Sequence, residues 1–379
     1  YIPTGVGTPD IWGGNRTELH ERYANSMLAL NASTGKLVWN FQTTHHDLWD
    51  MDVPSQPTLT DIKDKSGKMV PTIYVLTKTG NAFVLDRRTG AAIVPITEKP
   101  VPQTVKRGPQ TKGERYSATQ PFSDFDLAPK EKLTDKQMWG ATMFDQLMCR
   151  VSFHKLNYDG IYTPPSENGT LVFPGNLGVF EWGGMSVNPD RQIAVMNPIG
   201  LPFVSRLIPA DPNRPKTAKG AGTEAGVQPM YGVPYGVEIS AFLSPFGLPC
   251  KQPAWGFVAG VDLNTHEVAW KRRIGTIRDS LPGIQLPPFK MGVPMLGGSI
   301  STAGNVMFVG GTQDNYIRAI NVTNGDELWK GRLPAGGQAT PMTYEANGKQ
   351  YVVIMAGGHG SFGTKMGDAL VAYALPDAK

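Results

Sequence analysis

The residues best suited to chemistry are concentrated between Thr44 and Asp52. This stretch, Thr-His-His-Asp-Leu-Trp-Asp-Met-Asp, places two imidazoles and three carboxylates in nine residues directly after a strand-like run. Such side chains can transfer protons or hold a cation, although no single metal or triad pattern fits the spacing. The alternative is a structural loop in which aspartates accept hydrogen bonds from nearby backbone amides and His45 or His46 is exposed. Spacing alone leaves both interpretations open.

The composition favours a folded protein rich in strands and turns. Hydrophobic residues make up 40% of the 379 residues, and 44 glycines and 32 prolines are typical of many short strands joined by tight turns. Basic residues exceed acidic ones by only 36 − 32 = 4 and are dispersed, so no nucleic-acid partner is expected. We therefore expect an all-β fold.

The chain is expected to be a piece of a longer protein. It begins at Tyr1 in strand-like sequence without an initiator methionine, and no stretch approaches about 18 consecutive apolar residues. Any membrane anchor or export signal is therefore expected upstream.

The two cysteines, Cys149 and Cys250, show no metal-ligand spacing. They could form a disulfide or remain thiols, and we expect two buried thiols.

A strand–turn–strand repeat that ends in tryptophan recurs along the chain. The first copy runs from Ala29 to Trp39 and carries asparagine, threonine and glycine in its turn. The same offsets recur in residues 84–94, 260–270 and 319–329, with Val94 in the tryptophan place and His266 in the glycine place. Each copy predicts a hairpin, because asparagine, aspartate and glycine supply the turn conformations.

The final tryptophan supplies an apolar surface that one four-stranded unit cannot bury alone. Radial stacking of such units buries it, which is the β-propeller solution. Further strand pairs precede two of the hairpins, at residues 182–197 and 297–310, and a last unit begins at residues 338–343. We expect a β-propeller of Trp-terminated four-stranded blades, of which this chain carries about five blades or part-blades.

Two long segments, near residues 95–165 and 198–255, interrupt the repeat. The first begins rich in proline and basic residues and then predicts a short helix between Lys132 and Val151. The apolar side chains loosely on one face of this helix are Met138, Met143, Leu147 and Val151. The second segment is so rich in proline that a long excursion is expected rather than regular strands. Such loops can shape a binding mouth or simply decorate the surface.

Four motifs resemble those of membrane-bound quinoprotein dehydrogenases of the glucose and quinate type. They are residues 45–52 (His-His-Asp-Leu-Trp-Asp-Met-Asp), 77–81 (Thr-Lys-Thr-Gly-Asn), 180–184 (Phe-Glu-Trp-Gly-Gly) and 357–363 (Gly-Gly-His-Gly-Ser-Phe-Gly). The resemblance covers essentially the whole chain and corresponds to the C-terminal half of a quinoprotein glucose dehydrogenase. It implies an eight-bladed propeller that holds pyrroloquinoline quinone (PQQ) on its axis, with the N-terminal blades and the membrane anchor outside these 379 residues.

The resemblance also implies roles for single residues. Asp50 matches the general base that removes the proton of the substrate hydroxyl. Lys78 matches the cation that hydrogen-bonds the quinone oxygens, and the alternative is a lysine in a turn before Gly80. The remaining matches lie near the cofactor or the substrate side, namely Asn197, Trp182, Leu296 and His359. Trp182 and Leu296 could instead be ordinary propeller core, since Leu296 stands where related alcohol dehydrogenases carry a tryptophan.

Further partners follow from the resemblance. A divalent cation, calcium or magnesium, accompanies PQQ, but its ligands are not assigned in this chain, because Thr8 stands where the alcohol dehydrogenases have an asparagine ligand. A haem-binding CxxCH motif is absent from the sequence, so electrons are expected to pass to ubiquinone in the membrane.

The expected function is the oxidation of a sugar, D-glucose to its lactone, on the periplasmic side of the bacterial inner membrane. A quinate or shikimate dehydrogenase of the same family is the enzymatic alternative, because both kinds of substrate present a ring hydroxyl that needs the same base. A noncatalytic propeller scaffold of the bacterial envelope shares the tryptophan repeats and is the nonenzymatic alternative. The joint presence of Asp50, Lys78 and His359 favours an enzyme.

Overall fold

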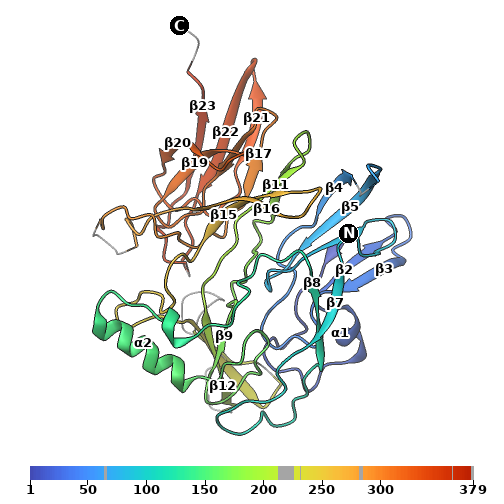
Figure 1. Cartoon of the computed structure of the whole chain (residues 1–379), viewed down its shortest axis with the longest axis vertical. Coiled ribbons are helices and arrows are strands. Elements are labelled where there is room, and N and C mark those ends of the chain that lie inside the picture. The colour runs from blue at the N-terminus through green and yellow to red at the C-terminus, as the bar shows by residue number, and fades with distance from the viewer. Residues whose placement is uncertain (64–65, 212–225, 231, 281–284, 361, 377–379) are drawn as a thin grey trace. The chain divides into compact units, whose positions relative to one another are not determined.

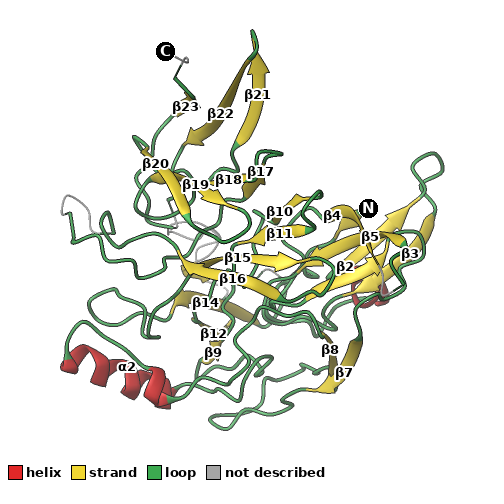
Figure 2. Cartoon of the chain, turned by 45° about the horizontal axis from the view of Figure 1, so that its top comes forward, coloured by secondary structure: helices red, strands yellow, loops and turns green. Residues whose placement is uncertain are grey.

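The computed structural model describes residues 1–63, 66–211, 226–230, 232–280, 285–360 and 362–376 (Figure 1). The chain divides into two compact units. The first comprises residues 1–59, 72–180 and 200–253, and the second comprises residues 60–71, 181–199 and 254–379. Figure 2 shows that strands make up most of the regular structure in the described part of the chain. None of the described helices is long and apolar enough to cross a membrane.

In its described residues the first unit contains short antiparallel sheets and two helices. One sheet has the order β1 (Ile2–Pro3), β2 (Ser26–Leu30) and β3 (Leu37–Gln42). A second pairs β7 (Ile96–Pro100) with β8 (Thr119–Ser123). A third has the order β13 (Gly226–Gln228), β14 (Tyr235–Ala241), β12 (Phe203–Pro209) and β9 (Thr170–Val172). The helices are α1 (Glu18–Tyr23) and α2 (Met143–Lys155), and a 3-10 turn, η1, spans Asp135–Gln137.

The second unit is built from antiparallel meanders. One sheet has the order β10 (Met185–Asn188), β11 (Ile193–Met196), β15 (Phe257–Asp262) and β16 (Val268–Arg273). The next has the order β17 (Ser299–Ser301), β18 (Val306–Val309), β19 (Tyr316–Asn321) and β20 (Glu327–Arg332). The last has the order β21 (Met342–Ala346), β22 (Lys349–Ala356) and β23 (Ala369–Ala374). A further sheet has the order β4 (Thr58–Lys63), β5 (Met69–Leu76) and β6 (Ala82–Asp86).

The predicted hairpins are confirmed in three of the four repeats, and they share one irregularity. The strand register shifts at Ala29/Leu30, at Gly260/Val261 and at Ala319/Ile320, which is the same offset in each repeat. The turn glycines are left-handed, with φ of +69° at Gly35 and +76° at Gly325. His266 occupies the same turn position with φ of +60°, so a non-glycine residue adopts the glycine conformation there.

The tryptophan that ends a repeat packs on the turn of the following repeat. Trp39 donates a hydrogen bond from Nε1 to the carbonyl of Arg87 at 3.1 Å, and a Cβ atom on Gly90 would lie 2.9 Å from the Trp39 ring. Trp270 donates in the same way to the carbonyl of Val322 at 2.8 Å and lies over Gly325. Trp39 and Trp270 therefore bury their surface between successive repeats, as the sequence predicts, whereas Trp329 is 41% exposed.

The proline-rich segment 198–255 differs from the irregular chain that we expected. It contains β12 and β14, which pair antiparallel along their whole length, from Phe203 opposite Ala241 to Pro209 opposite Tyr235. Proline lacks an N–H group and is tolerated at strand ends, and Pro209 is the last residue of β12. Pro212 and Pro215 lie outside the described residues. In chain order the segment lies between β11 and β15, which are neighbours in one sheet.

The predicted helix begins later than expected, and its apolar face is not in the core. Residues 132–142 contain only the short turn η1 within this part of the chain, and α2 runs from Met143 to Lys155. Met138 is buried, whereas Met143, Leu147 and Val151 are exposed.

The expectation of two buried thiols is wrong, because Cys149 and Cys250 form a disulfide with their Cα atoms 5.3 Å apart. The fold brings together cysteines that are 101 residues apart in sequence, and no local pattern records that proximity.

Candidate active site

The loop from Thr44 to Asp52 is held in place by Asp47. The Asp47 carboxylate is buried and accepts hydrogen bonds from the Asn25 side chain at 2.7 Å and from the backbone amides of Trp49 at 2.8 Å and Met51 at 2.6 Å. Burial raises the pKa of Asp47, and the hydrogen bonds from Trp49 and Asn25 together with the Arg16 guanidinium oppose the rise. Asp47 therefore has the structural role that the alternative interpretation of this loop assigned to its aspartates.

The two histidines are also engaged by the scaffold. The His46 ring is buried and lies between Glu21 at 2.8 Å and Glu114 at 2.9 Å. The His45 ring contacts Gln42 at 2.6 Å and Glu98 at 3.0 Å. Both nitrogens of each ring thus have a partner within the first unit, which indicates that the histidines position the loop.

Asp50 is the carboxylate of this loop that accepts a hydrogen bond from an ammonium group. Its backbone is left-handed, with φ of +59°, and its side chain is 28% exposed. Lys78 donates a hydrogen bond from Nζ to Oδ2 of Asp50 at 2.7 Å, and the same Nζ lies 3.3 Å from Oδ1 of Asp52. Burial raises the pKa of Asp50 well above its usual value; Lys78 opposes the rise, and the neighbouring charge of Asp52 adds to it.

The backbone around Lys78 is clamped on both sides. Its amide donates to the carbonyl of Asp52 at 3.2 Å, and its carbonyl accepts from the amide of Val179 at 2.8 Å. A Cβ atom on Gly178 would lie 2.6 Å from the Cα of Lys78, so only glycine fits at that position. The turn is closed by Thr79, whose hydroxyl oxygen lies 2.7 Å from that of Thr77. The ammonium of Lys78 is therefore presented by a rigid turn.

Four predicted site residues belong to the second unit. Asn197 is buried and donates from Nδ2 to the carbonyls of Met295 and Gly297, both at 3.3 Å, so it braces the backbone on either side of Leu296. Leu296 itself is 1% exposed and Trp182 is 42% exposed. The backbone amide of His359 donates to Thr364 Oγ1 at 2.8 Å. The structure thus brings Asp50 to Lys78 in the first unit and Asn197 to the flanks of Leu296 in the second.

Sequence reasoning missed two carboxylates near Lys78. Asp52 lay in the motif, but nothing in the sequence indicated that it shares the ammonium of Lys78 with Asp50. Asp10 had no signal at all; burial raises its pKa, and the charges of Arg16 and Lys78 oppose the rise. Within the described ranges, no group of three or more histidine, cysteine, aspartate or glutamate residues is arranged to hold a metal ion.

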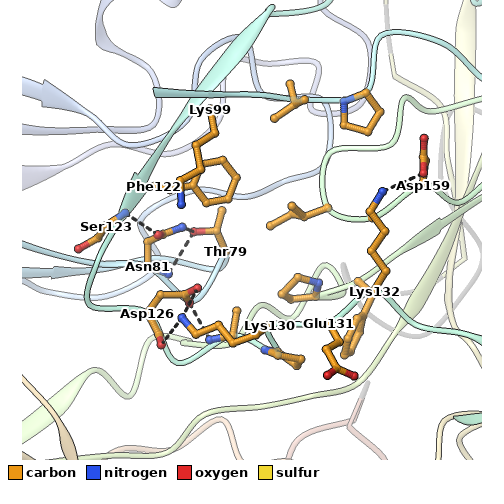
Figure 3. Close-up of a pocket in the computed structure, with 18 of the residues that line it drawn as sticks. Thr79, Asn81, Lys99, Phe122, Ser123, Asp126, Lys130, Glu131, Lys132 and Asp159 are labelled. Carbon is orange, nitrogen blue, oxygen red and sulfur yellow. Dashed lines mark hydrogen bonds and ion pairs between the residues drawn. The ribbon is translucent and has the colours of Figure 1, made fainter. Parts of the chain in front are cut away.

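A pocket of about 600 Å³ lies in the first unit on the turn that follows Lys78 (Figure 3). Thr79 and Asn81 line it, together with Phe122 of β8. Its lysines are paired in part, since Lys130 lies 3.1 Å from Asp126 and Lys132 lies 2.9 Å from Asp159. Asp50 and Lys78 are not among the residues that line this pocket, so it is separate from the candidate site.

Comparisons with known proteins identify the family. The β-propeller domain described as "PQQ: Glucose/ethanol/alcohol dehydrogenase" matches residues 1–352. The chain is 87% identical to quinoprotein glucose dehydrogenase A of Acinetobacter calcoaceticus and 66% identical to quinoprotein glucose dehydrogenase of Escherichia coli strain K12, in each case over 100% of this chain and 47% of the relative. A probable quinate dehydrogenase (quinone) of Xanthomonas campestris pv. juglandis is 42% identical, over 100% of this chain and 48% of the relative.

A solved structure agrees with the fold. Quinohemoprotein alcohol dehydrogenase from Comamonas testosteroni matches with a TM-score of 0.57 at 22% identity, over 97% of this chain and 45% of that chain. The predicted β-propeller fold is thereby confirmed, while the number of blades stays a prediction. The chain spans about half the length of the curated relatives that it matches. It belongs to the family of PQQ-type glucose, ethanol and alcohol dehydrogenase β-propellers.

Proposed function

We propose that the whole protein oxidises D-glucose to its lactone with PQQ as hydride acceptor and ubiquinone as electron acceptor. The observation that carries this proposal is the contact between Asp50 and Lys78, which places a partly exposed carboxylate and an ammonium 2.7 Å apart on two rigid turns. A base and a cation in one place are what the removal of a hydroxyl proton and the stabilisation of a reduced quinone oxygen require.

Asp50 is the proposed base. Burial raises the pKa of Asp50, which makes it a stronger base than a carboxylate in water, and the Lys78 ammonium opposes this rise. It would accept the proton of the sugar hydroxyl at a carboxylate oxygen. PQQ, when bound, supplies the acceptor for the hydride.

Lys78 is the proposed cofactor ligand of the first unit. Its ammonium would donate a hydrogen bond to a quinone oxygen, and its position is fixed through its backbone contacts to Asp52 and Val179. Asn176 adds a candidate polar group, because it donates to the carbonyl of Trp49 at 3.0 Å while its buried Oδ1 has no hydrogen-bond partner in the part of the chain described. Donors and acceptors at this edge of the loop fit a polar quinone cofactor.

The proposed cofactor contacts of the second unit are Asn197, Trp182, Leu296 and His359. Trp182 offers a partly exposed ring, whereas Leu296 is buried and would act through packing. We also propose a divalent cation, calcium or magnesium. It is favoured by the charge of the Asp50, Asp52 and Lys78 group, in which two carboxylates face one ammonium.

The location that we propose is the periplasmic side of the bacterial inner membrane, with attachment through a region outside these residues. The Cys149–Cys250 disulfide supports an oxidising compartment. A scaffold without catalysis is disfavoured, because the chain is 87% identical to a protein named as a quinoprotein glucose dehydrogenase.

A substrate panel tests the proposal. The full-length protein, loaded with PQQ and a divalent cation, should reduce an artificial electron-accepting dye with D-glucose and much less with quinate or shikimate. Faster dye reduction with quinate than with D-glucose would support the enzymatic alternative, a quinate or shikimate dehydrogenase, which would use the same base. No dye reduction with any sugar or cyclic polyol would contradict an enzymatic function.

A further inference from the structure

Helix α2 presents an apolar face to solvent. Met143, Phe144, Leu147, Met148 and Val151 recur at the spacing of one helix face. Met143 is 83% exposed and Phe144 is 79% exposed, while the opposite side of the helix buries Asp145 and Cys149. Figure 2 shows α2 in red, and its inward side packs in a cluster with Leu171 of β9. An amphipathic helix normally buries its apolar face, whereas the apolar face of α2 points away from the core of its own unit.

Hydrogen bonds and a disulfide on the buried side of α2 hold the helix in this orientation. Thr142 caps the first turn by accepting a hydrogen bond from the Asp145 amide at 3.1 Å, and the Asp145 carboxylate accepts one from the amide of Ala141 at 3.1 Å. One turn further on, Cys149 is bonded to Cys250. Rotation of the helix to hide its apolar face would break both attachments.

A second apolar element lies beside the end of α2. Leu243 is 44% exposed and Phe246 is 65% exposed, in the turn that leads to Cys250. Leu243 lines the same shallow pocket, of about 280 Å³, as Ser152 and Lys155 of α2. The disulfide therefore joins two exposed apolar elements of the first unit.

The charged side chains on the exposed side of α2 are basic. Arg150 and Lys155 are exposed, and Asp145, the only acidic residue of the helix, is buried. His154 is exposed and lies 3.6 Å from Asp135 of η1, which is the acidic group that faces α2 from the neighbouring turn. The open surface of the helix thus combines apolar side chains with cations near its C-terminal end.

We propose that α2, together with the Leu243–Phe246 turn, lies in the surface of a phospholipid bilayer with anionic headgroups. A membrane fits better than a protein partner because one side of the helix combines exposed apolar side chains with cations and has no exposed acidic side chain. Arg150 and Lys155 match the cations that flank helices lying in the interface. The contact is independent of the proposed oxidation, since it uses no residue of the candidate site.

Photolabelling of the membrane-reconstituted full-length protein tests this proposal. The probe is a phosphatidylcholine with a photoreactive group on its acyl chain, added to vesicles of phosphatidylcholine alone or mixed equally with phosphatidylglycerol. Labelled peptides are then mapped by mass spectrometry. Residues 143–155 should be labelled, and the α1 peptide with Leu19, which is 69% exposed, should not be.

Matched variants sharpen the result. Leu147→Glu should lower labelling of α2 about tenfold, the order expected from losing the burial of one leucine. Leu19→Glu, an equally polar change on the other helix, should leave α2 labelling unchanged. Arg150→Gln and Lys155→Gln should each lower labelling roughly fivefold in the phosphatidylglycerol vesicles and little in phosphatidylcholine alone.

Three results would overturn the proposal. The first is labelling of residues 143–155 no stronger than that of the α1 peptide. The second is a Leu147→Glu variant that is labelled like the wild type. The third is chemical cross-linking of α2 to a second copy, or to another region of the same protein, together with absence of lipid label, which would show that protein covers this face.

Discussion

Lys78 and Asp50 form an ion pair of 2.7 Å between two turns that are 28 residues apart in sequence. The pair is not isolated, because Asp52 lies 3.3 Å from the same ammonium and its charge raises the pKa of Asp50. The pKa of the proposed base is therefore set first by burial, which raises it, and then by two neighbours of opposite charge.

Replacement of Asp52 should move the pH dependence of turnover in a defined direction. Asp52→Asn removes a negative charge that raises the pKa of Asp50, so the pKa of Asp50 should fall. A base with a lower pKa stays ionised in more acidic solution, and the acid limb of the kcat/KM profile should shift to lower pH. An acid limb that stays in place or moves to higher pH would show that Asp52 does not act on the base.

Lys78 should contribute to both cofactor binding and rate. Lys78→Ala removes the cation at the proposed quinone oxygens and should lower PQQ affinity and turnover together. Lys78→Arg keeps the charge and should restore part of each. Equilibrium titration with PQQ and steady-state assays separate the two effects. If Lys78→Ala kept the wild-type PQQ affinity and turnover rate, Lys78 would not be a cofactor ligand.

The packing of tryptophan on the next repeat should be measurable with two glycines. Gly35 and Gly90 both have positive φ, of +69° and +75°, so alanine strains the backbone equally at each. A Cβ atom meets nothing within 4 Å at Gly35 but lies 2.9 Å from the Trp39 ring at Gly90. Gly90→Ala should therefore cost about 1–3 kcal/mol more in free energy of unfolding than Gly35→Ala. Equal losses of unfolding free energy for the two variants in denaturant titrations would argue against the packing of Trp39 on Gly90.

The disulfide should stabilise the fold. Cys149 and Cys250 close a loop of 101 residues, and removal of a native disulfide typically costs about 2–5 kcal/mol. The double variant Cys149→Ala/Cys250→Ala should show this loss in chemical unfolding, and reduced wild-type protein should behave like the variant. A loss below about 0.5 kcal/mol would mean that the packing around α2 suffices without the bond.

Local features of the fold could be predicted from sequence, whereas distant pairings could not. The hairpin that ends at Trp39 follows from a turn of fixed spacing, and even the substitution of His266 for glycine keeps the left-handed conformation. The pairing of β12 with β14 was missed because prolines dominate the composition of that segment while occupying strand ends. The bond between Cys149 and Cys250 depends on tertiary contacts that no local pattern encodes.

In the candidate site, too, the residues could be predicted from sequence, but their distant partners could not. The resemblance singled out Asp50 and Lys78, and the structure places them in contact. The spacing of the residues alone did not separate the roles of Asp47 and Asp50, which lie three positions apart. Their difference depends on the Asn25 side chain and two backbone amides for Asp47 and on the distant Lys78 for Asp50, and these partners become visible only in the folded chain.

The activity of Asp50→Asn in the full-length protein tests the central claim most directly. Asparagine tolerates the left-handed backbone of this position and keeps the size of the side chain, but it cannot accept the hydroxyl proton. PQQ affinity should stay close to that of the wild type while glucose turnover falls by about 10²–10⁴, the usual contribution of a positioned base. Turnover at the wild-type rate with PQQ bound would contradict the assignment of Asp50 as the base.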